Sequence, residues 1–380
     1  MSKILHVFTA PQSAYYFMEG QLQYLIQNGF DVEVILPDDG VFSELFKKRE
    51  KNIIVHHVSF ERNISIINDF KSLMKLIRLI NKIKPDIVHL HTPKACLLGS
   101  IASRFLLKKI IIYQMHGLVS TEGEKSKKNL MYWIERFTCL LATHIFAVSN
   151  SLMEFAIEHN YCSRDKIRVI NNGTINGIDF EKKFNPTLIQ QHIDVNLESK
   201  FVVGFVGRIT HDKGIFDYLK VVESLKHDGV DVFGYIVGPD ESKGEFEEFI
   251  SRSTLVKDVD LKYVGEALNP EIHMISFDIL LVPTHREGFG LVAAEANALT
   301  IPYVGYDIIG IKDAVSNNET GILVKYNDLD ALKEAVLKYV QKPKLIEVHG
   351  IHGFERVKKM FNKEMLWQSI FNEYESLLRK

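Results

Sequence analysis

Residues 279–295 read ILLVPTHREGFGLVAAE, a short apolar run, then a polar stretch with two glycines, then an alanine-rich run. The first run predicts a buried strand and the last predicts a helix. Gly288 and Gly290 fall at the turn between them, where glycine lets the backbone approach a ligand closely. The stretch therefore predicts a strand–turn–helix unit that presents backbone N–H groups at the positive end of a helix, a favourable place for an anion.

A second strand that runs into a glycine turn occurs at residues 204–214, which read GFVGRITHDKG. Here the turn carries two fixed cations, Arg208 and Lys213. Both can point at one diphosphate, arginine through its planar fork and lysine as a point charge. Such donors suit a reaction in which negative charge grows on a departing phosphate, where each is worth about 2.7–4 kcal/mol.

Short β-branched runs alternate with helical patterns along the whole chain, which predicts an α/β fold with parallel sheets flanked by helices. The pattern restarts after a polar stretch, so we expect two doubly wound Rossmann-like domains facing a central cleft. The expected parts are an N-terminal domain (1–180), a linker (181–199), a C-terminal domain (200–362) and a last helix (363–380) that packs back toward the N-terminal domain.

Individual elements follow from the same patterns. The expected strands are residues 4–8, 32–36, 53–58, 87–91, 110–115, 144–148, 167–170, 201–206, 232–237, 261–264, 279–282, 302–304 and 322–324. Expected helices include residues 21–27, 73–83 and 130–141, and the polar loop 120–128 is expected to be flexible.

Composition narrows the class of protein. The 380 residues fit two domains, and 46% hydrophobic with 25% charged residues is ordinary for a soluble protein. A net charge of −2 argues against nucleic-acid binding. The three cysteines are widely spaced, which gives no disulfide framework and no zinc pattern. We find no signal peptide and no apolar run of about 18 residues, so we expect a cytoplasmic protein without a spanning helix.

Together, the GR-x4-KG and E-x7-E patterns resemble those of the retaining GT-B glycosyltransferases. The resemblance covers most of residues 1–340 and is most specific at 204–214 and 283–321. Residues 91–99 and 171–179 make the chain similar to the branch that assembles bacterial capsules, O-antigens and lipid-linked glycans. The resemblance implies a nucleotide-sugar donor, with UDP favoured over GDP, and a saccharide acceptor carried on polyprenyl diphosphate. No cofactor and no metal ion are expected.

The resemblance also assigns roles at the donor site. It implies that Glu287 contacts the donor sugar, that Glu295 binds the ribose, and that Arg208 and Lys213 hold the diphosphate. Their spacing alone allows one carboxylate to meet a sugar while the other reaches the ribose hydroxyls. Further donor contacts are expected from Val264, against the base, and from the backbone of Gly288, Phe289, Gly290 and Leu291.

The amino-terminal half supplies the remaining candidates. His116 follows strand 110–115, and similar transferases place a histidine there beside the donor sugar; the alternative is an ordinary hydrogen-bonded histidine at a strand end. The loop 9–17 lacks the glycines usual in the family, which leaves an acceptor role open. Ser13 and Lys94 follow the first and fourth strands and are expected to meet the acceptor's diphosphate, although Lys94 also fits an ordinary helix start.

Helix 71–84 places its basic residues on one face, a pattern typical either of a surface that lies on anionic lipid or of a solvated face. The inner face of the membrane is therefore a candidate partner. Altogether we expect retaining, metal-independent transfer of a hexose or N-acetylhexosamine in surface polysaccharide synthesis. A nucleotide-sugar epimerase and a non-catalytic nucleotide-sugar-binding protein remain alternatives. The E-x7-E spacing favours transfer over the first, and the four charged residues together argue against the second.

Overall fold

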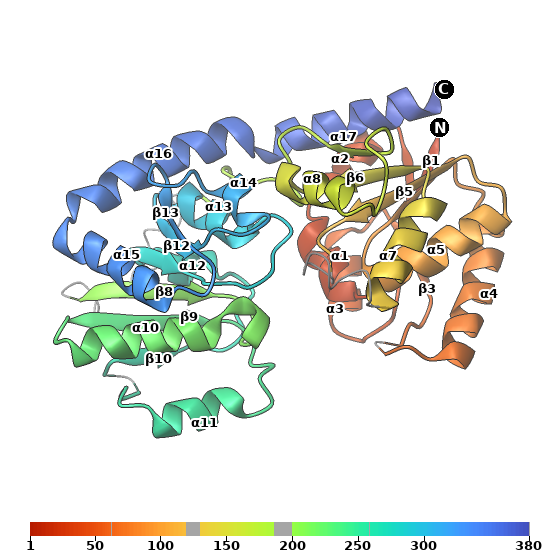
Figure 1. Cartoon of the computed structure of the whole chain (residues 1–380). Helices are drawn as coiled ribbons and strands as arrows, with labels where there is room; N and C mark the ends of the chain where they lie inside the picture. The colour runs from red at the N-terminus through yellow and green to blue at the C-terminus, as the bar shows by residue number, and fades with distance from the viewer. Residues whose placement is uncertain (62, 119–129, 186–199, 258, 380) are drawn as a thin grey trace. The chain divides into compact units, whose positions relative to one another are not determined.

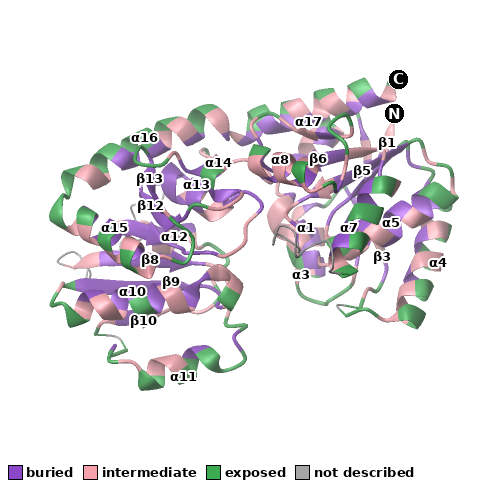
Figure 2. Ribbon diagram, in the orientation of Figure 1, coloured by how far each residue is buried: buried purple, intermediate pink, exposed green. Residues whose placement is uncertain are grey.

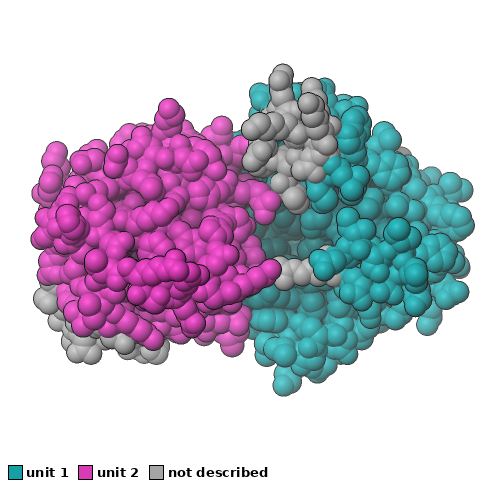
Figure 3. Space-filling view, turned by 60° about the horizontal axis from the view of Figure 1, so that its bottom comes forward, with its two compact units in different colours: residues 1–176, 363–380 teal, residues 177–362 magenta. Residues whose placement is uncertain are grey.

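The computed structural model describes the chain except for residues 62, 119–129, 186–199, 258 and 380 (Figure 1). It divides into two compact units (Figure 3): residues 1–176 with 363–380 form the first unit, and residues 177–362 form the second. Most of the expected linker and the expected flexible loop 120–128 lie outside the described residues.

The first unit contains a seven-stranded parallel sheet in the order β3-β2-β1-β4-β5-β6-β7. Runs such as Ile110-Ile111-Ile112 form strands because β-branched side chains pack well on a sheet, and here helices cover them (Figures 1 and 2). The strands are β1 (Lys3–Val7), β2 (Asp31–Leu36), β3 (Ile54–His57), β4 (Ile87–Leu90), β5 (Ile110–Met115), β6 (His144–Ala147) and β7 (Ile167–Val169). The helices are α1 (Pro11–Phe17), α2 (Gln21–Gln27), α3 (Phe42–Arg49), α4 (Ile66–Ile83), α5 (Pro93–Phe105), α7 (Leu130–Leu141), α8 (Asn150–Glu158) and α17 (Lys363–Leu378).

The second unit has a six-stranded parallel sheet in the order β10-β9-β8-β11-β12-β13. Its strands are β8 (Phe201–Val206), β9 (Val232–Val237), β10 (Leu261–Tyr263), β11 (Ile279–Leu281), β12 (Tyr303–Tyr306) and β13 (Gly321–Val324). Its helices are α10 (Ile215–His227), α11 (Glu245–Arg252), α12 (Glu271–Met274), α13 (Leu291–Ala298), α14 (Ile311–Ala314), α15 (Leu329–Gln341) and α16 (Lys344–Met360), with a 3-10 turn at His211–Lys213.

Both sheets therefore share one connectivity. In each unit the first strand lies beside the fourth, β1 beside β4 and β8 beside β11, and the strand order reverses there. At such a switch point the connections leave toward opposite sides, so the carboxyl ends of the two strands border a crevice in which ligands bind. The predicted α/β class with two doubly wound Rossmann-like domains is confirmed.

The last helix belongs to the first unit. Side chains on one face of α17 are buried in that unit's core, among them Leu366, Ile370 and Tyr374. The indole Nε1 of Trp367 donates to Oδ1 of Asn176 at 2.8 Å. The chain thus leaves the first unit after Asn176 and returns to it for its final helix.

One local expectation is wrong, and one expected helix starts earlier than predicted. Residues 9–17 are not a loop, since α1 occupies most of them; Pro11 stands at its first position, where a missing N–H costs nothing. Helix 71–84 is part of a longer helix, α4, which starts at Ile66. No helix in the described part of the chain is long and apolar enough to cross a membrane.

Candidate active site

The two motif loops of the second unit pack directly on each other. They follow β8 and β11, the neighbouring strands at the switch point. The carbonyl of Asp212 accepts hydrogen bonds from the backbone N–H of His285 at 2.9 Å and from the Thr284 hydroxyl at 3.0 Å. Gly214 has φ +75°, and a Cβ there would lie 2.0 Å from the carbonyl oxygen of Pro283. Only glycine fits this approach, so the GR-x4-KG and EGFG segments form one structural unit.

An ion pair joins the two loops. The ammonium of Lys213 contacts the carboxylate of Glu287, and their side chains are 21% and 17% exposed. Such partial burial makes the pair electrostatically stronger than one in open water. The sequence predicted that both residues serve one ligand, and the structure places them in contact.

Three cations surround one carboxylate beside this pair. Nη2 of Arg208 lies 3.4 Å from Oδ2 of Asp212, and Nη2 of Arg286 lies 3.5 Å from the same oxygen. Burial alone would raise the pKa of Asp212, but a hydrogen bond with Thr210 and the charges of Arg208, Lys213 and Arg286 outweigh it and lower that pKa. Arg208 also contacts Glu241 and Lys213 contacts Glu287, so three cations and three carboxylates meet at these loops, and an anionic ligand would compete with the carboxylates for the cations.

Arg286 was not predicted from the sequence. The residue directly precedes Glu287, and its cationic side chain in the same loop was the available signal. Arg208 also contacts Glu241, with Nη1 3.1 Å from Oε2, so its guanidinium is held from two sides.

The glycine turn of residues 288–291 is fixed by packing. Gly290 has φ +82° and precedes α13, and a Cβ there would lie 2.6 Å from Cδ1 of Ile311. The ring of Phe289 is buried against Phe361, with centroids 4.9 Å apart. Leu291 is the first residue of α13, as the sequence predicted for a helix start at this turn.

Glu295 and Val264 complete the donor-side candidates. Glu295 lies in α13 and is partly buried. Burial raises the pKa of its carboxyl to about 7; the Lys183 charge opposes this shift and the Glu271 charge adds to it. Val264 follows β10, two strands from β8, and its N–H donates to Ile236 at 2.9 Å. Both residues therefore stand on the carboxyl side of the same sheet.

His116 lies in the first unit, directly after β5, and is half-buried. Burial lowers the pKa of its ring to about 4, so the imidazole is neutral at pH 7. Its Nε2 lies 3.3 Å from Nδ1 of His91, and its ring packs on Phe17 with centroids 5.1 Å apart.

Ser13 and Lys94 follow β1 and β4, which meet at the switch point of the first unit. Ser13 lies in α1 and Lys94 in the first turn of α5. The ammonium of Lys94 is 2.8 Å from a carboxylate oxygen of Asp69 and donates to the Asn63 carbonyl at 2.6 Å. Lys94 thus already has two anionic or polar contacts, and an acceptor role for it stays a prediction.

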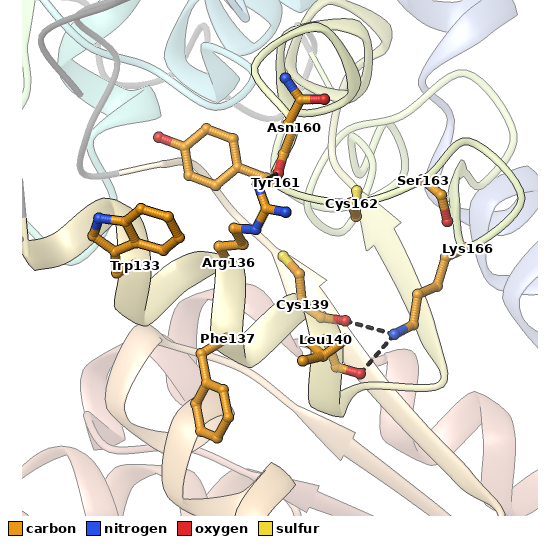
Figure 4. Close-up of a pocket in the computed structure, with 10 residues that line it drawn as sticks. All are labelled: Trp133, Arg136, Phe137, Cys139, Leu140, Asn160, Tyr161, Cys162, Ser163 and Lys166. Atoms are coloured by element: carbon orange, nitrogen blue, oxygen red, sulfur yellow. Dashed lines mark hydrogen bonds between the residues drawn. The ribbon is translucent and has the colours of Figure 1, made fainter. Parts of the chain in front are cut away.

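The first unit also has a cavity of about 530 Å³ between α7 and the segment 160–166 (Figure 4). The rings of Trp133 and Phe137 line it, together with Arg136. Lys166 donates to the carbonyls of Cys139 and Leu140 at 2.7 and 2.8 Å, so it caps the C-terminal end of α7. The sequence did not predict this cavity, which contains none of the motif residues.

Comparison with known proteins agrees with this arrangement. Residues 189–352 match the family model described as glycosyl transferases group 1, and residues 18–175 match the one described as glycosyltransferase family 4. The capsular polysaccharide biosynthesis glycosyltransferase CapM of Staphylococcus aureus is 33% identical over 383 residues, which cover 100% of this chain and 98% of CapM. The chain belongs to the group 1 glycosyltransferases.

Other relatives of this glycosyltransferase are more distant. An Escherichia coli protein named UDP-Gal:alpha-D-GlcNAc-diphosphoundecaprenol alpha-1,3-galactosyltransferase is 26% identical, over 90% of this chain and 89% of its own. Among solved structures, HepE of Anabaena with UDP-glucose superposes with a TM-score of 0.79 at 19% identity, covering 99% of this chain and 100% of HepE. Sucrose-phosphate synthase of Thermosynechococcus elongatus gives 0.81 at 18% identity, with both chains fully covered. These two likenesses concern the fold.

Proposed function

We propose that this glycosyltransferase moves a hexose or N-acetylhexosamine from a UDP-sugar to a saccharide carried on polyprenyl diphosphate, in the synthesis of a surface polysaccharide. The observation that carries the proposal is the contact between the two motif loops at the β8/β11 switch point, which the Lys213–Glu287 ion pair joins. The names of the S. aureus and E. coli relatives support the polysaccharide product, the UDP donor and the lipid-linked acceptor.

The donor's diphosphate binds, in this proposal, where Arg208 and Lys213 lie beside the backbone of residues 288–291. The cations take up the negative charge that grows as the sugar–phosphate bond breaks, so the reaction needs no metal ion. Glu287 contacts the sugar, Glu295 the ribose and Val264 the base. Activity that survives EDTA supports metal independence, and a strict requirement for added Mg²⁺ or Mn²⁺ contradicts it.

Retention of configuration is part of the same proposal. His116 contacts the donor sugar during turnover as a neutral hydrogen-bonding group, because burial keeps its ring uncharged. The leaving phosphate takes the proton of the acceptor hydroxyl on the face from which it departs. NMR of the product tests this step: an α-linked product from an α-linked donor supports retention, and a β-linked product contradicts it.

One screen tests the main proposal. The purified chain is incubated with UDP- and GDP-sugars, with and without polyprenyl-diphosphate-linked saccharides, and nucleotide release is measured. We expect release that requires a UDP-sugar and a lipid-linked acceptor together. Epimerised or free sugar formed equally well without acceptor would favour the epimerase instead, and donor binding without any turnover would favour a non-catalytic role.

The lipid-linked acceptor implies work at a membrane, and the first unit has suitable surfaces. On α4 the basic residues Lys71, Lys75, Arg78 and Lys82 are exposed. On α7 the large side chains Leu130, Trp133, Phe137 and Leu140 are exposed, with Trp133 56% accessible. Exposed aromatic and basic residues together are typical of surfaces that lie on anionic lipid. We propose that the enzyme acts at the cytoplasmic face of the membrane and that α7 contacts it.

Vesicle flotation tests the membrane contact. We expect the chain to float with phosphatidylglycerol vesicles but not with phosphatidylcholine vesicles. Trp133→Ala with Phe137→Ala should weaken binding at least tenfold, since full burial of one ring is worth about 1.5–3 kcal/mol. The double substitution Val256→Ala and Val259→Ala, at exposed apolar residues of the second unit, is the control. Equal loss in both double variants would contradict a role for α7.

A further inference from the structure

Three histidines form a hydrogen-bonded line across the first unit's sheet. His6 lies on β1, His91 directly follows β4, and His116 directly follows β5, and these strands are neighbours in the order β1-β4-β5. Nδ1 of His6 is 3.0 Å from Nε2 of His91, and Nδ1 of His91 is 3.3 Å from Nε2 of His116. We call these three residues the histidine file.

The file is buried and uncharged. His6 is fully buried and His91 nearly so, and the ring of His91 stacks on Phe8 with centroids 4.3 Å apart. Burial lowers the pKa of His6 to about 3 and of His116 to about 4; burial, and then the neighbouring rings, lower the pKa of His91 as well. Each ring therefore carries one N–H at pH 7.

Both ends of the file are buried nitrogen atoms. Nε2 of His6 and Nδ1 of His116 have no hydrogen-bond partner among the described residues. Three rings share three protons, and two of these protons lie in the two internal hydrogen bonds. The third proton must stand at one end, so only two arrangements exist: all three rings protonated on Nδ1, or all three on Nε2. The tautomer of His116 is thus tied to that of His6.

The two ends differ in their surroundings. His6 is in the core, whereas His116 is half-buried at the carboxyl end of β5, where ligands reach a parallel sheet. A buried N–H without a partner is rarer in proteins than a buried acceptor without one. The unpaired N–H is therefore better placed on His116, the end nearer to solvent; its Nδ1 is covered in this structure, so a ligand oxygen can accept the hydrogen bond only once the side chains over it move.

We propose that His6 and His91 are positioning residues that hold His116 in its Nδ1–H tautomer, so that His116 donates a hydrogen bond to an oxygen of the nucleotide-sugar donor. The role toward the donor rests on the proposed function, whereas the tautomer follows from the file alone. A fixed tautomer would mean that Nδ1 only has to be uncovered, with no proton exchange inside the file, before His116 meets the donor.

His89 is a matched control within the same group of rings. It is as buried as His91 and stacks on it with centroids 4.3 Å apart. Its nitrogens are bonded elsewhere, Nδ1 to the Tyr374 hydroxyl at 2.5 Å and Nε2 to Oε1 of Gln114 at 3.1 Å. Replacing His89 disturbs the packing around the file but breaks neither of its hydrogen bonds.

Nitrogen-15 NMR tests the tautomer directly. The full chain is labelled at the histidine ring nitrogens, and two-bond ¹H–¹⁵N spectra report which nitrogen of each ring carries the proton, with His116→Phe identifying the His116 signals. We expect His6, His91 and His116 all to be protonated on Nδ1. Protonation of His116 on Nε2, or an equal mixture in the wild-type chain, overturns the proposal.

Substitutions within the file give the sharper result. His91→Phe removes the partner of Nε2 of His116 and should change the His116 spectrum to a mixture of tautomers. By contrast, His6→Phe leaves the bond between His91 and His116 in place, with a buried nitrogen of His91 as the new end, and should keep His116 protonated on Nδ1. In His89→Phe the His116 tautomer should stay as in wild type. An unchanged His116 tautomer in folded His91→Phe, or an equal change in His89→Phe, overturns the proposal. Thermal melting verifies that each variant is folded.

Kinetics test the consequence for transfer. In His91→Phe we expect kcat to fall about 10- to 100-fold, the usual effect of removing a group that orients a functional histidine, with the donor KM little changed. A shifted tautomer with normal kcat overturns the positioning role. If wild type turns over no donor, the proposed function fails, while the NMR spectra still show whether the file fixes the tautomer of His116.

A bound metal ion is the alternative explanation for these rings, because nitrogens of His6, His89 and His91 lie within 4.8 Å of one another. Metal analysis of the purified chain is therefore included. A stoichiometric ion on these rings would contradict the hydrogen-bonded file.

Discussion

The two switch points of this molecule have the same strand order and opposite chemistry. At β8 and β11 the loops carry glycine turns, three cations and paired carboxylates. At β1 and β4 the loops are joined by neutral groups: the hydroxyls of Thr9 and Thr92 lie 2.7 Å apart, and His6 and His91 are uncharged. The strand order thus fixes where ligands bind, and the loop residues decide which ligand is bound. The charged switch point suits the donor's diphosphate. At the other, the threonines and histidines suit sugar hydroxyls, and Lys94, paired with Asp69, stays the candidate for the acceptor's diphosphate.

Removing the central cation of the charged switch point should have the largest effect. In Lys213→Ala the departing diphosphate loses one preorganised donor and Glu287 loses its partner, so we expect kcat/KM to fall about 10²- to 10³-fold. Nucleotide release with a UDP-sugar and a lipid-linked acceptor measures it. Melting temperature should change little, since the pair is only partly buried.

Lys333 offers a matched control for this substitution. It is 19% exposed and ion-paired with Asp228 at 2.5 Å, but it lies on α15, near the C-terminal end of α10 and away from the carboxyl ends of the strands. Lys333→Ala should keep near wild-type kcat/KM. Comparable loss of activity in both variants would mean that the effect of Lys213→Ala is structural.

Substitutions at the two switch points should affect the binding of donor and of acceptor separately. Arg208→Ala should weaken UDP binding about 10- to 100-fold, because a hydrogen bond to a charged group contributes about 1.5–3 kcal/mol. Lys94→Ala should leave UDP binding unchanged and raise only the acceptor KM, because Lys94 belongs to the other unit. Titration calorimetry with UDP at pH 8 measures the first effect, and initial rates measure the second.

Arg208→Lys sharpens this test, since it keeps the charge and loses the planar fork. We expect it to recover only part of the UDP affinity. Weaker UDP binding in Lys94→Ala, equal to that of Arg208→Ala, would contradict the assignment of the donor to the second unit.

Much of the fold could be predicted because its signals are local. β-Branched runs gave most strands to within one or two residues, and α2 and α7 have the predicted bounds. The sequence also placed Lys213 and Glu287 on two glycine turns of one sheet, but it did not predict their direct ion pair. The loop expected at residues 9–17 came from the family resemblance, and it failed because Pro11 begins a helix there, a position that proline favours.

The histidine file could not be predicted, because it depends on strand order. His6, His91 and His116 are far apart in the sequence, and no local pattern says that β4 lies between β1 and β5. The same holds for the contact of Lys94 with Asp69, which joins two helices. Arg286 lies beside a predicted residue, yet only the packing of its loop on Asp212 gives it a place in the site.

The smallest expected effect concerns Glu295 and the pH. The pKa of this carboxyl is raised to about 7, so the free protein holds it neutral below pH 7 and ionised above. Ribose hydroxyls donate to a carboxylate, which favours the ionised form. Donor affinity should therefore rise with pH and level off above 7, with about a tenfold gain between pH 6 and pH 8 if only the ionised form binds.

UDP-glucose is the suitable probe, because its diphosphate carries no group that titrates in this range, unlike free UDP. Calorimetry at pH 6, 7 and 8 should show the rise in wild type and a flat, weaker profile in Glu295→Gln, whose amide cannot ionise. The difference between the two profiles isolates Glu295 from every other titrating group. Parallel profiles in both proteins would mean that the ribose does not bind this carboxylate. The charged switch point would then bind the diphosphate without a contact between Glu295 and the ribose.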